Sequence, residues 1–173
     1  MKVLLTSLIA FSLTAHLACA ATGPTPCAAA VHHQFDFWVG EWVVTENGKP
    51  AGTNRIERLL DGCALLENWT GAGGSRGHSL NFYDPGRKLW QQTWVDASPS
   101  SLNLTGGWVD GRMVLSGSGK DAKTGRAQID RIAWTPNSDG TVRQLWDRSL
   151  DGGRTWQVLF DGLYRRREGA TRP

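Results

Sequence analysis

Turn-forming residues recur at short intervals from Gly40 onward, and this spacing constrains the fold more than any other feature of the chain. Gly, Pro, Asn and Asp, which favour chain reversals, cluster at residues 47–50, 61–62, 71–77, 84–86, 98–100, 110–111, 120–125, 137–140 and 151–153. Between these clusters lie about ten segments of strand length, beginning near residues 40, 51, 64, 78, 89, 101, 112, 126, 141 and 155. The pattern predicts an all-β chain in which consecutive strands are antiparallel neighbours.

A sheet of about ten short antiparallel strands has two unpaired edges unless it closes on itself. We therefore expect an up-and-down antiparallel barrel, with a two-sheet sandwich as the alternative, although Greek-key crossovers need longer connections than most of these turns provide. The length is that of one domain. We expect a lead-in over residues 21–33, a single barrel domain over residues 34–167 and a C-terminal tail over residues 168–173.

An aromatic-rich stretch, residues 33–44, precedes the first predicted strand. It contains two Phe and two Trp, a density that suits a segment packed into a core. Gly40 permits a sharp backbone turn, after which apolar and polar residues alternate as in a strand. The stretch predicts a short 3₁₀ or helical plug that leads into the first strand.

The N-terminus has the features of an export signal. A mostly apolar segment over residues 3–17 is followed by small residues ending at Ala20. We expect a signal peptide over residues 1–20 and a mature protein that is periplasmic or secreted, in a bacterium. The alternative is a lipoprotein acylated at Cys19, but His16 stands where such motifs carry Leu.

The mature chain retains Cys27 and Cys63. In an exported protein a lone pair of cysteines favours a disulfide, here between the lead-in and the turn after the second strand. The alternative is a buried Cys63 and an unpaired, exposed Cys27.

Several ligand classes are disfavoured. Positive and negative charges nearly cancel and form no long block, apart from residues 165–167 at the chain end, so no nucleic-acid partner is expected. His32 and His33 are adjacent on an extended segment and point apart, and the mature chain has only one other histidine, His78, so no metal site is expected. We also expect no cofactor and no membrane span.

Three predicted strands repeat a polar residue two positions before a Trp: Glu67 and Trp69, Gln92 and Trp94, Gln144 and Trp146. Two-residue alternation places both members of each pair on one face of the strand. A core that served structure alone would favour Leu, Ile and Val, whereas buried polar groups need partners. We therefore predict a cavity for an amphipathic ligand, lined by Arg58, Glu67, Trp69, Trp90, Gln92, Trp94, Trp134, Gln144 and Trp146.

Residues 40–42, Gly-Glu-Trp, resemble the Gly-x-Trp signature of the calycins, the superfamily of lipocalins and fatty-acid-binding proteins. The resemblance implies a late basic residue packed across Trp42, and Arg165 or Arg166 is suitably placed; we take Gly40, Trp42 and Arg165 as the signature. The motifs FDFWVGEW, GCALLE, NFYD and DGLY, which begin at residues 35, 62, 81 and 161, are similar to those of a family of exported bacterial proteins of unassigned function. That likeness implies a fold and a compartment, and no catalytic residues.

Residues 149–156 match the Asp-box pattern Ser-x-Asp-x-Gly-x-Thr-Trp, a hairpin motif in which the Asp organises the turn. We read it as structural.

Three functions remain open. The first is an exported small-molecule binding or carrier barrel. The second is an enzyme, such as an isomerase, cyclase or hydrolase, that uses Glu67 in the same cavity. The third is a structural or interaction module with a filled barrel. Binding is favoured over catalysis, because no local motif assembles a catalytic group.

Overall fold

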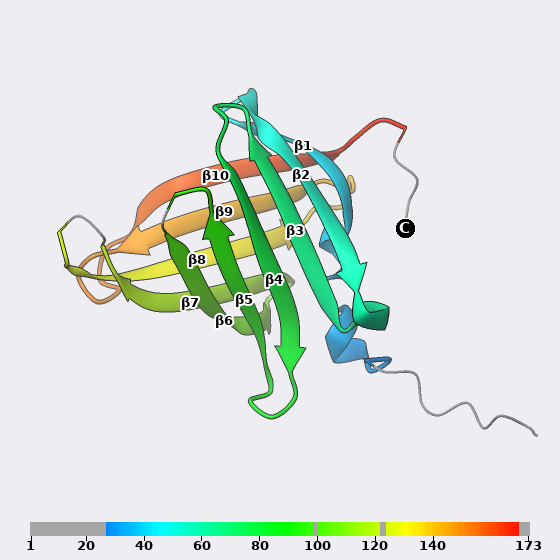
Figure 1. The fold of residues 1–173 in the computed structure, drawn as a ribbon, viewed down its shortest axis with the longest axis horizontal. Helices are drawn as coiled ribbons and strands as arrows, with labels where there is room; N and C mark the ends of the chain where they lie inside the picture. The colour runs from blue at the N-terminus through cyan, green and yellow to red at the C-terminus, as the bar shows by residue number, and fades with distance from the viewer. Residues whose placement is uncertain (1–26, 99, 122–123, 170–173) are drawn as a thin grey trace, which may run out of the picture.

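The computed structural model describes residues 27–98, 100–121 and 124–169, and these form one closed antiparallel barrel (Figure 1). Each strand pairs with its neighbours in sequence, and the first strand closes the barrel by pairing with the last. The strands are β1 (Gly40–Glu46), β2 (Lys49–Leu59), β3 (Ala64–Gly71), β4 (Arg76–Asp84), β5 (Leu89–Asp96), β6 (Ser101–Val109), β7 (Arg112–Lys120), β8 (Ala127–Pro136), β9 (Val142–Ser149) and β10 (Gln157–Arg166). The predicted up-and-down barrel is confirmed, and the sandwich alternative is wrong.

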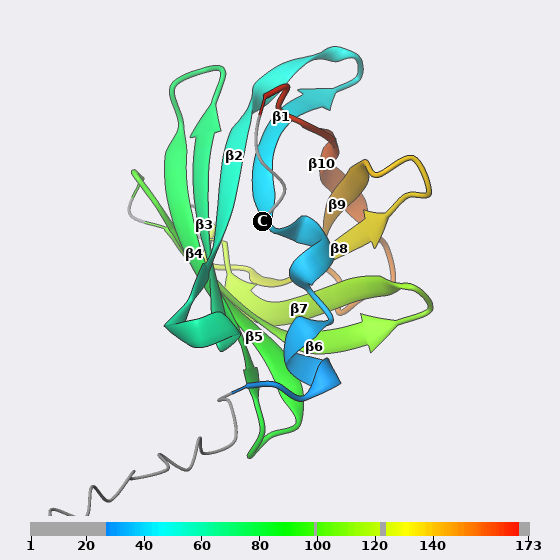
Figure 2. The same cartoon turned by 90° about the vertical axis from the view of Figure 1, so that its right-hand side faces the viewer.

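Two 3₁₀ turns, η1 (Ala30–His33) and η2 (Asp36–Trp38), lie across one end of the barrel (Figure 2). We call residues 30–38 the plug and this end the plug end. Phe35 and Trp38 are fully buried, with ring centroids 4.9 Å apart, and the Phe35 ring meets the edge of Trp134 at 5.1 Å. The predicted aromatic plug is therefore present, and its rings fill the plug end of the barrel.

The opposite end of the barrel is the mouth. Because the strands alternate in direction, the β1–β2, β3–β4, β5–β6, β7–β8 and β9–β10 connections lie there, while η3 (Leu60–Gly62) and the other connections lie at the plug end. The fully buried core, which includes Trp42, Trp90, Met113 and Leu115, packs around the plug. Core packing is thus concentrated at the plug end.

A cation closes the seam between β1 and β10. The Arg166 guanidinium lies 4.3 Å from the ring centre of Trp42 and donates a hydrogen bond to the Val39 carbonyl at 2.9 Å. The prediction of Arg165 in this place is wrong, because Trp42 pairs with Arg166 and alternation turns Arg165 outward, where it reaches Thr45. Gly40 has φ 133°, and an added Cβ would lie 2.2 Å from Arg166 Nη1, so glycine is required beside this cation.

A disulfide joins Cys27 to Cys63, which follows η3. It ties the lead-in to the β2–β3 connection at the plug end, and the predicted disulfide is confirmed. The predicted signal peptide and the alternative acylation site at Cys19 lie outside the described residues. Among the residues that the structure describes, no helix has the length and apolar character needed to cross a membrane.

The β9–β10 connection folds as the Asp-box motif predicts. The Asp151 carboxylate accepts hydrogen bonds from the hydroxyls of Ser149 and Thr155 and from the backbone amides of Arg154 and Thr155. These donors lower the pKa of Asp151 to about 2. The motif therefore has a structural role at the rim of the mouth.

Candidate functional site

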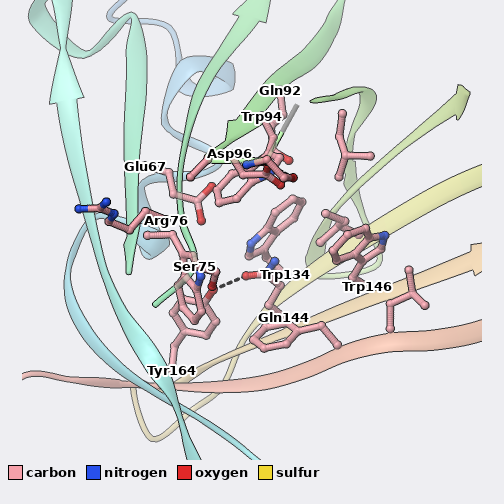
Figure 3. A pocket seen from close by; sticks show the side chains of 17 residues that line it. Glu67, Ser75, Arg76, Gln92, Trp94, Asp96, Trp134, Gln144, Trp146 and Tyr164 are labelled. Carbon is pink, nitrogen blue, oxygen red and sulfur yellow. Dashed lines mark hydrogen bonds between the residues drawn. The ribbon is translucent and has the colours of Figure 1, made fainter. Parts of the chain in front are cut away.

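A cavity of about 460 Å³ occupies the mouth half of the barrel (Figure 3). Seven of the nine predicted ligand-binding residues line it: Glu67, Trp69, Gln92, Trp94, Trp134, Gln144 and Trp146. The remaining wall is formed by Ser75, Arg76, Asp96, Ala97, Ser98, Leu102, Ile132, Leu159, Phe160 and Tyr164. The barrel is filled at its plug end and hollow at its mouth.

Strand register brings the polar and aromatic residues together. On β3 and β4, Glu67 pairs with Ser79, and Ser79 in turn pairs with Trp94 on β5. On the far side, Trp134 of β8 pairs with Gln144 of β9. Each of these residues lies on the inward face of its strand, so the period-two pattern in the sequence becomes a continuous wall.

Inward-facing glycines make room for the aromatic rings. A Cβ on Gly77 would lie 2.2 Å from the Trp94 ring, one on Gly52 would lie 2.8 Å from the Trp69 ring, and one on Gly162 would lie 2.4 Å from the Phe160 ring. Each ring therefore packs directly against bare backbone of the barrel wall. Because the rings take up this space at the wall, the centre of the lumen remains open.

A chain of hydrogen bonds crosses the floor of the cavity, and we call it the polar belt. Glu67 is its centre: Asn54 Nδ2 donates to Oε1 at 2.7 Å, and the Ser79 hydroxyl donates to Oε2 at 2.6 Å. Asn81 Nδ2 donates to Ser79 Oγ at 2.8 Å, and Gln92 Nε2 donates to Asn81 Oδ1 at 2.8 Å. The belt thus runs across β2, β3, β4 and β5.

The belt continues on the other side of Asn54. Asn54 Nδ2 also lies 3.4 Å from the Tyr164 hydroxyl, which donates to Gln144 Oε1. Two buried polar atoms near this region, Asn54 Oδ1 and Trp134 Nε1, have no hydrogen-bond partner among the described residues. Unpaired buried polar groups are costly, so these two atoms mark places where the packing around the belt leaves hydrogen-bonding capacity unused.

The carboxyl group of Glu67 titrates near neutrality. Burial raises its pKa from 4.5 to about 7, and the hydrogen bonds from Ser79 and Asn54 offset part of that rise. Burial, together with the charge of Glu67, raises the pKa of Tyr164 well above its usual value of 10. Glu67 therefore changes charge near pH 7 beside a phenol that stays neutral.

Two predicted cavity residues lie elsewhere. Arg58 Nη2 forms an ion pair with Asp36 Oδ2 of the plug at 3.0 Å. Trp90 is buried inside the barrel against the plug, and its Nε1 donates to Gln34 Oε1 at 3.1 Å. Both residues are on the strand face that alternation predicts. The prediction that they line the cavity is wrong, because each lies at the plug end, on the far side of the polar belt from the mouth.

Sequence reasoning missed Tyr164 and Phe160 as lining residues. Both lie on the inward face of β10 with Gly162, so the same alternation that found the other strands was a usable signal. Ser75, Ala97 and Ser98 come from connections at the mouth, where no periodic pattern exists to assign a side chain to the lumen.

No protein-family model matches the sequence, and no curated protein matches it. Within the described residues, no group of three or more His, Cys, Asp or Glu side chains is placed to hold a metal ion. Functional inference therefore rests on the cavity itself.

Proposed function

We propose that this barrel binds or carries a small amphipathic molecule. The observation that carries the proposal is the division of the cavity wall: three indoles, those of Trp69, Trp94 and Trp146, stand above a floor that is made of Trp134 and of hydrogen-bonding groups centred on Glu67. Indoles supply apolar area and a ring face, while the floor orients a polar group. The volume is within the usual range for small-molecule sites.

We propose that binding takes place outside the cytoplasm. The predicted signal peptide and the disulfide between Cys27 and Cys63 support an oxidising compartment. Lipid anchoring at Cys19 remains an alternative, and kinship with the calycins stays a prediction.

Native mass spectrometry of protein expressed in a bacterial periplasm tests binding directly. We expect an additional mass of a few hundred daltons, removed by denaturation, on wild-type protein and on Trp108→Ala, whose side chain lies at the plug end beside Phe37 and does not line the cavity. We expect weaker retention on Trp69→Ala, which loses one wall of the cavity. An adduct of equal strength on all three proteins, or no adduct together with unchanged tryptophan fluorescence across a panel of amphipathic metabolites, would contradict the proposal.

An enzyme that uses Glu67 is the second candidate. The pKa of about 7 suits a general acid or base at neutral pH, and the carboxyl group lines the cavity. Incubation of the retained molecule with wild-type protein and with Glu67→Gln, followed by NMR of the small molecule, separates the two roles. Conversion by wild-type protein alone supports an enzyme, and an unchanged molecule in both samples supports a carrier.

A further inference from the structure

We infer that the cavity selects an organic cation: an amine or quaternary ammonium group on an apolar or aromatic body, with the cationic group set among the indoles beside Glu67. This inference rests on the proposed binding function and names the chemical class of the ligand. The acidic side chains and the indoles that line the cavity support it.

The inward-facing charges of the cavity are acidic. Glu67 stands at the floor, and Asp96 lies on the inward face of β5 at the mouth. Arg76, the one basic residue of the wall among the described residues, begins β4 on the opposite face from Gly77, and its guanidinium group is exposed and turned away from the indoles (Figure 3). A ligand inside therefore meets carboxyl groups without a facing cation.

The other arginine near the lumen is already paired. Arg148 Nε donates to Asp130 Oδ1 at 2.9 Å, and the same oxygen accepts from Trp146 Nε1 at 2.8 Å. Asp130 is only 2% exposed, so this ion pair is held inside the barrel and the charge of Arg148 is compensated. An anionic ligand would meet Arg76 at the exposed rim of the mouth and would face Glu67 inside the cavity.

The indoles supply the second half of a cation site. Trp69, Trp94, Trp134 and Trp146 come from β3, β5, β8 and β9, so they surround the lumen from different sides. The face of an indole is the best aromatic partner for an ammonium group, and the attraction strengthens when water is excluded. The Arg148 guanidinium already lies 5.7 Å from the ring centre of Trp146, which leaves Trp69, Trp94 and Trp134 as the indoles for a ligand cation. Indoles grouped near a carboxylate favour a cation over a neutral molecule of the same shape.

Glu67 has room for a further partner. It accepts one hydrogen bond on each oxygen, from Asn54 and from Ser79, whereas an ionised carboxylate has about four acceptor positions. Figure 3 shows its carboxyl group directed toward the interior of the ring of lining side chains. A cation in the lumen can therefore pair with Glu67 while the polar belt stays intact.

Cation binding should be coupled to the loss of a proton. The side chains that meet Glu67 from β2, β4 and β10 are those of Asn54, Ser79 and Tyr164, and only Tyr164 titrates, well above neutrality. Asp96 at the mouth has a lowered pKa, set mainly by the Ser98 hydroxyl, and stays ionised. Between pH 8 and pH 6 the ionised fraction of Glu67 falls about tenfold, and cation affinity should fall with it.

Three probes of similar size test the inference: phenyltrimethylammonium, its neutral isostere tert-butylbenzene, and benzenesulfonate. Binding is followed by tryptophan fluorescence and calorimetry at pH 6 and pH 8. We expect the cation to bind at least about tenfold more tightly than either other probe at pH 8, and about tenfold more weakly at pH 6 than at pH 8.

Two matched variants locate the effect. Glu67→Gln should abolish the pH dependence and most of the preference for the cation, while Glu57→Gln, the same change on the outward face of β2, should leave both unchanged. Equal or tighter binding of the neutral or anionic probe by wild-type protein overturns the inference and leaves the binding function standing. Failure of all three probes also overturns it, and the mass-spectrometric experiment then decides separately whether the cavity binds another class.

Discussion

Glu67 shows how a single residue sets the character of this barrel. An ionisable group buried in a lumen costs folding free energy when charged, and here Asn54 and Ser79 recover only part of that cost. Leu or Ile at this position would pack more simply. The retained carboxyl group is the residue that gives the cavity floor a charge that depends on pH.

The stability of the protein should reflect this titration. The pKa of Glu67 rises from 4.5 to about 7 on folding, so the folded state binds the proton more tightly than the unfolded state. The unfolding free energy should therefore be highest below about pH 4.5 and should fall as the pH rises to about 7. Relative to Glu67→Gln, wild-type protein should lose up to roughly 3 kcal/mol of unfolding free energy between pH 4.5 and pH 8. Urea unfolding of both proteins across this range measures the difference. Parallel pH profiles would show that folding does not change the pKa of Glu67.

Gly77 should control the volume of the cavity. A methyl group there would lie 2.2 Å from the Trp94 ring, so Gly77→Ala must push that indole toward the lumen. We expect a loss of about 1 to 3 kcal/mol in stability and weaker binding of any ligand. Gly107→Ala on β6 meets no atom within 4 Å and serves as the control in urea unfolding and fluorescence titration. Equal effects of the two substitutions would contradict the role of Gly77 as a seat for Trp94.

At the scale of the element, each strand specifies which face a side chain takes but not how deep it lies. Trp90 and Trp94 share the inward face of β5, but four residues along a strand span about 13 Å. Trp90 is therefore buried against the plug, whereas Trp94 borders the cavity. Arg58 on β2 fails as a cavity residue for the same reason. Alternation in the sequence therefore predicted the wall of the site, whereas depth depends on how far the plug fills the barrel.

The seam between β1 and β10 allows a matched test of strand face. Arg166→Met loses the contact with Trp42 and leaves the Val39 carbonyl without this donor, so we expect a destabilisation of about 1 to 3 kcal/mol. Arg165→Met, one residue away on the outward face, should change stability by less than about 0.5 kcal/mol. Thermal and urea unfolding compare the two, and a larger effect at Arg165 would reverse the assignment.

At the scale of the whole molecule, the even spacing of turns was sufficient to predict the barrel, and the Asp-box to predict its last hairpin. A closed sheet follows from short connections and from the need to remove unpaired edges, both of which are local properties of the sequence. The unequal filling of the two ends is a property of the assembled barrel. Residues from the mouth connections, such as Ser98, and the partial filling of the lumen were therefore beyond what periodicity reveals.

The disulfide should contribute to global stability by restraining the unfolded chain. Cys27 and Cys63 are 36 residues apart, a loop that corresponds to about 4 kcal/mol in the chain-entropy description. The double substitution Cys27→Ala and Cys63→Ala should lower the unfolding free energy by about that amount, and reduction of wild-type protein should reproduce the change in urea unfolding. Unfolding curves that do not move on reduction would show that the crosslink leaves the unfolded state unrestrained.

Phe35 and Trp38 close one end of the barrel, and this limits how a ligand could enter and leave the cavity. If the barrel binds a ligand as proposed, that ligand cannot pass through the plug end and must enter and leave by the mouth. On the same proposal, a partner that takes up the ligand would approach the rim near the β3–β4, β5–β6 and β9–β10 connections, and one ligand would have to leave before another could bind.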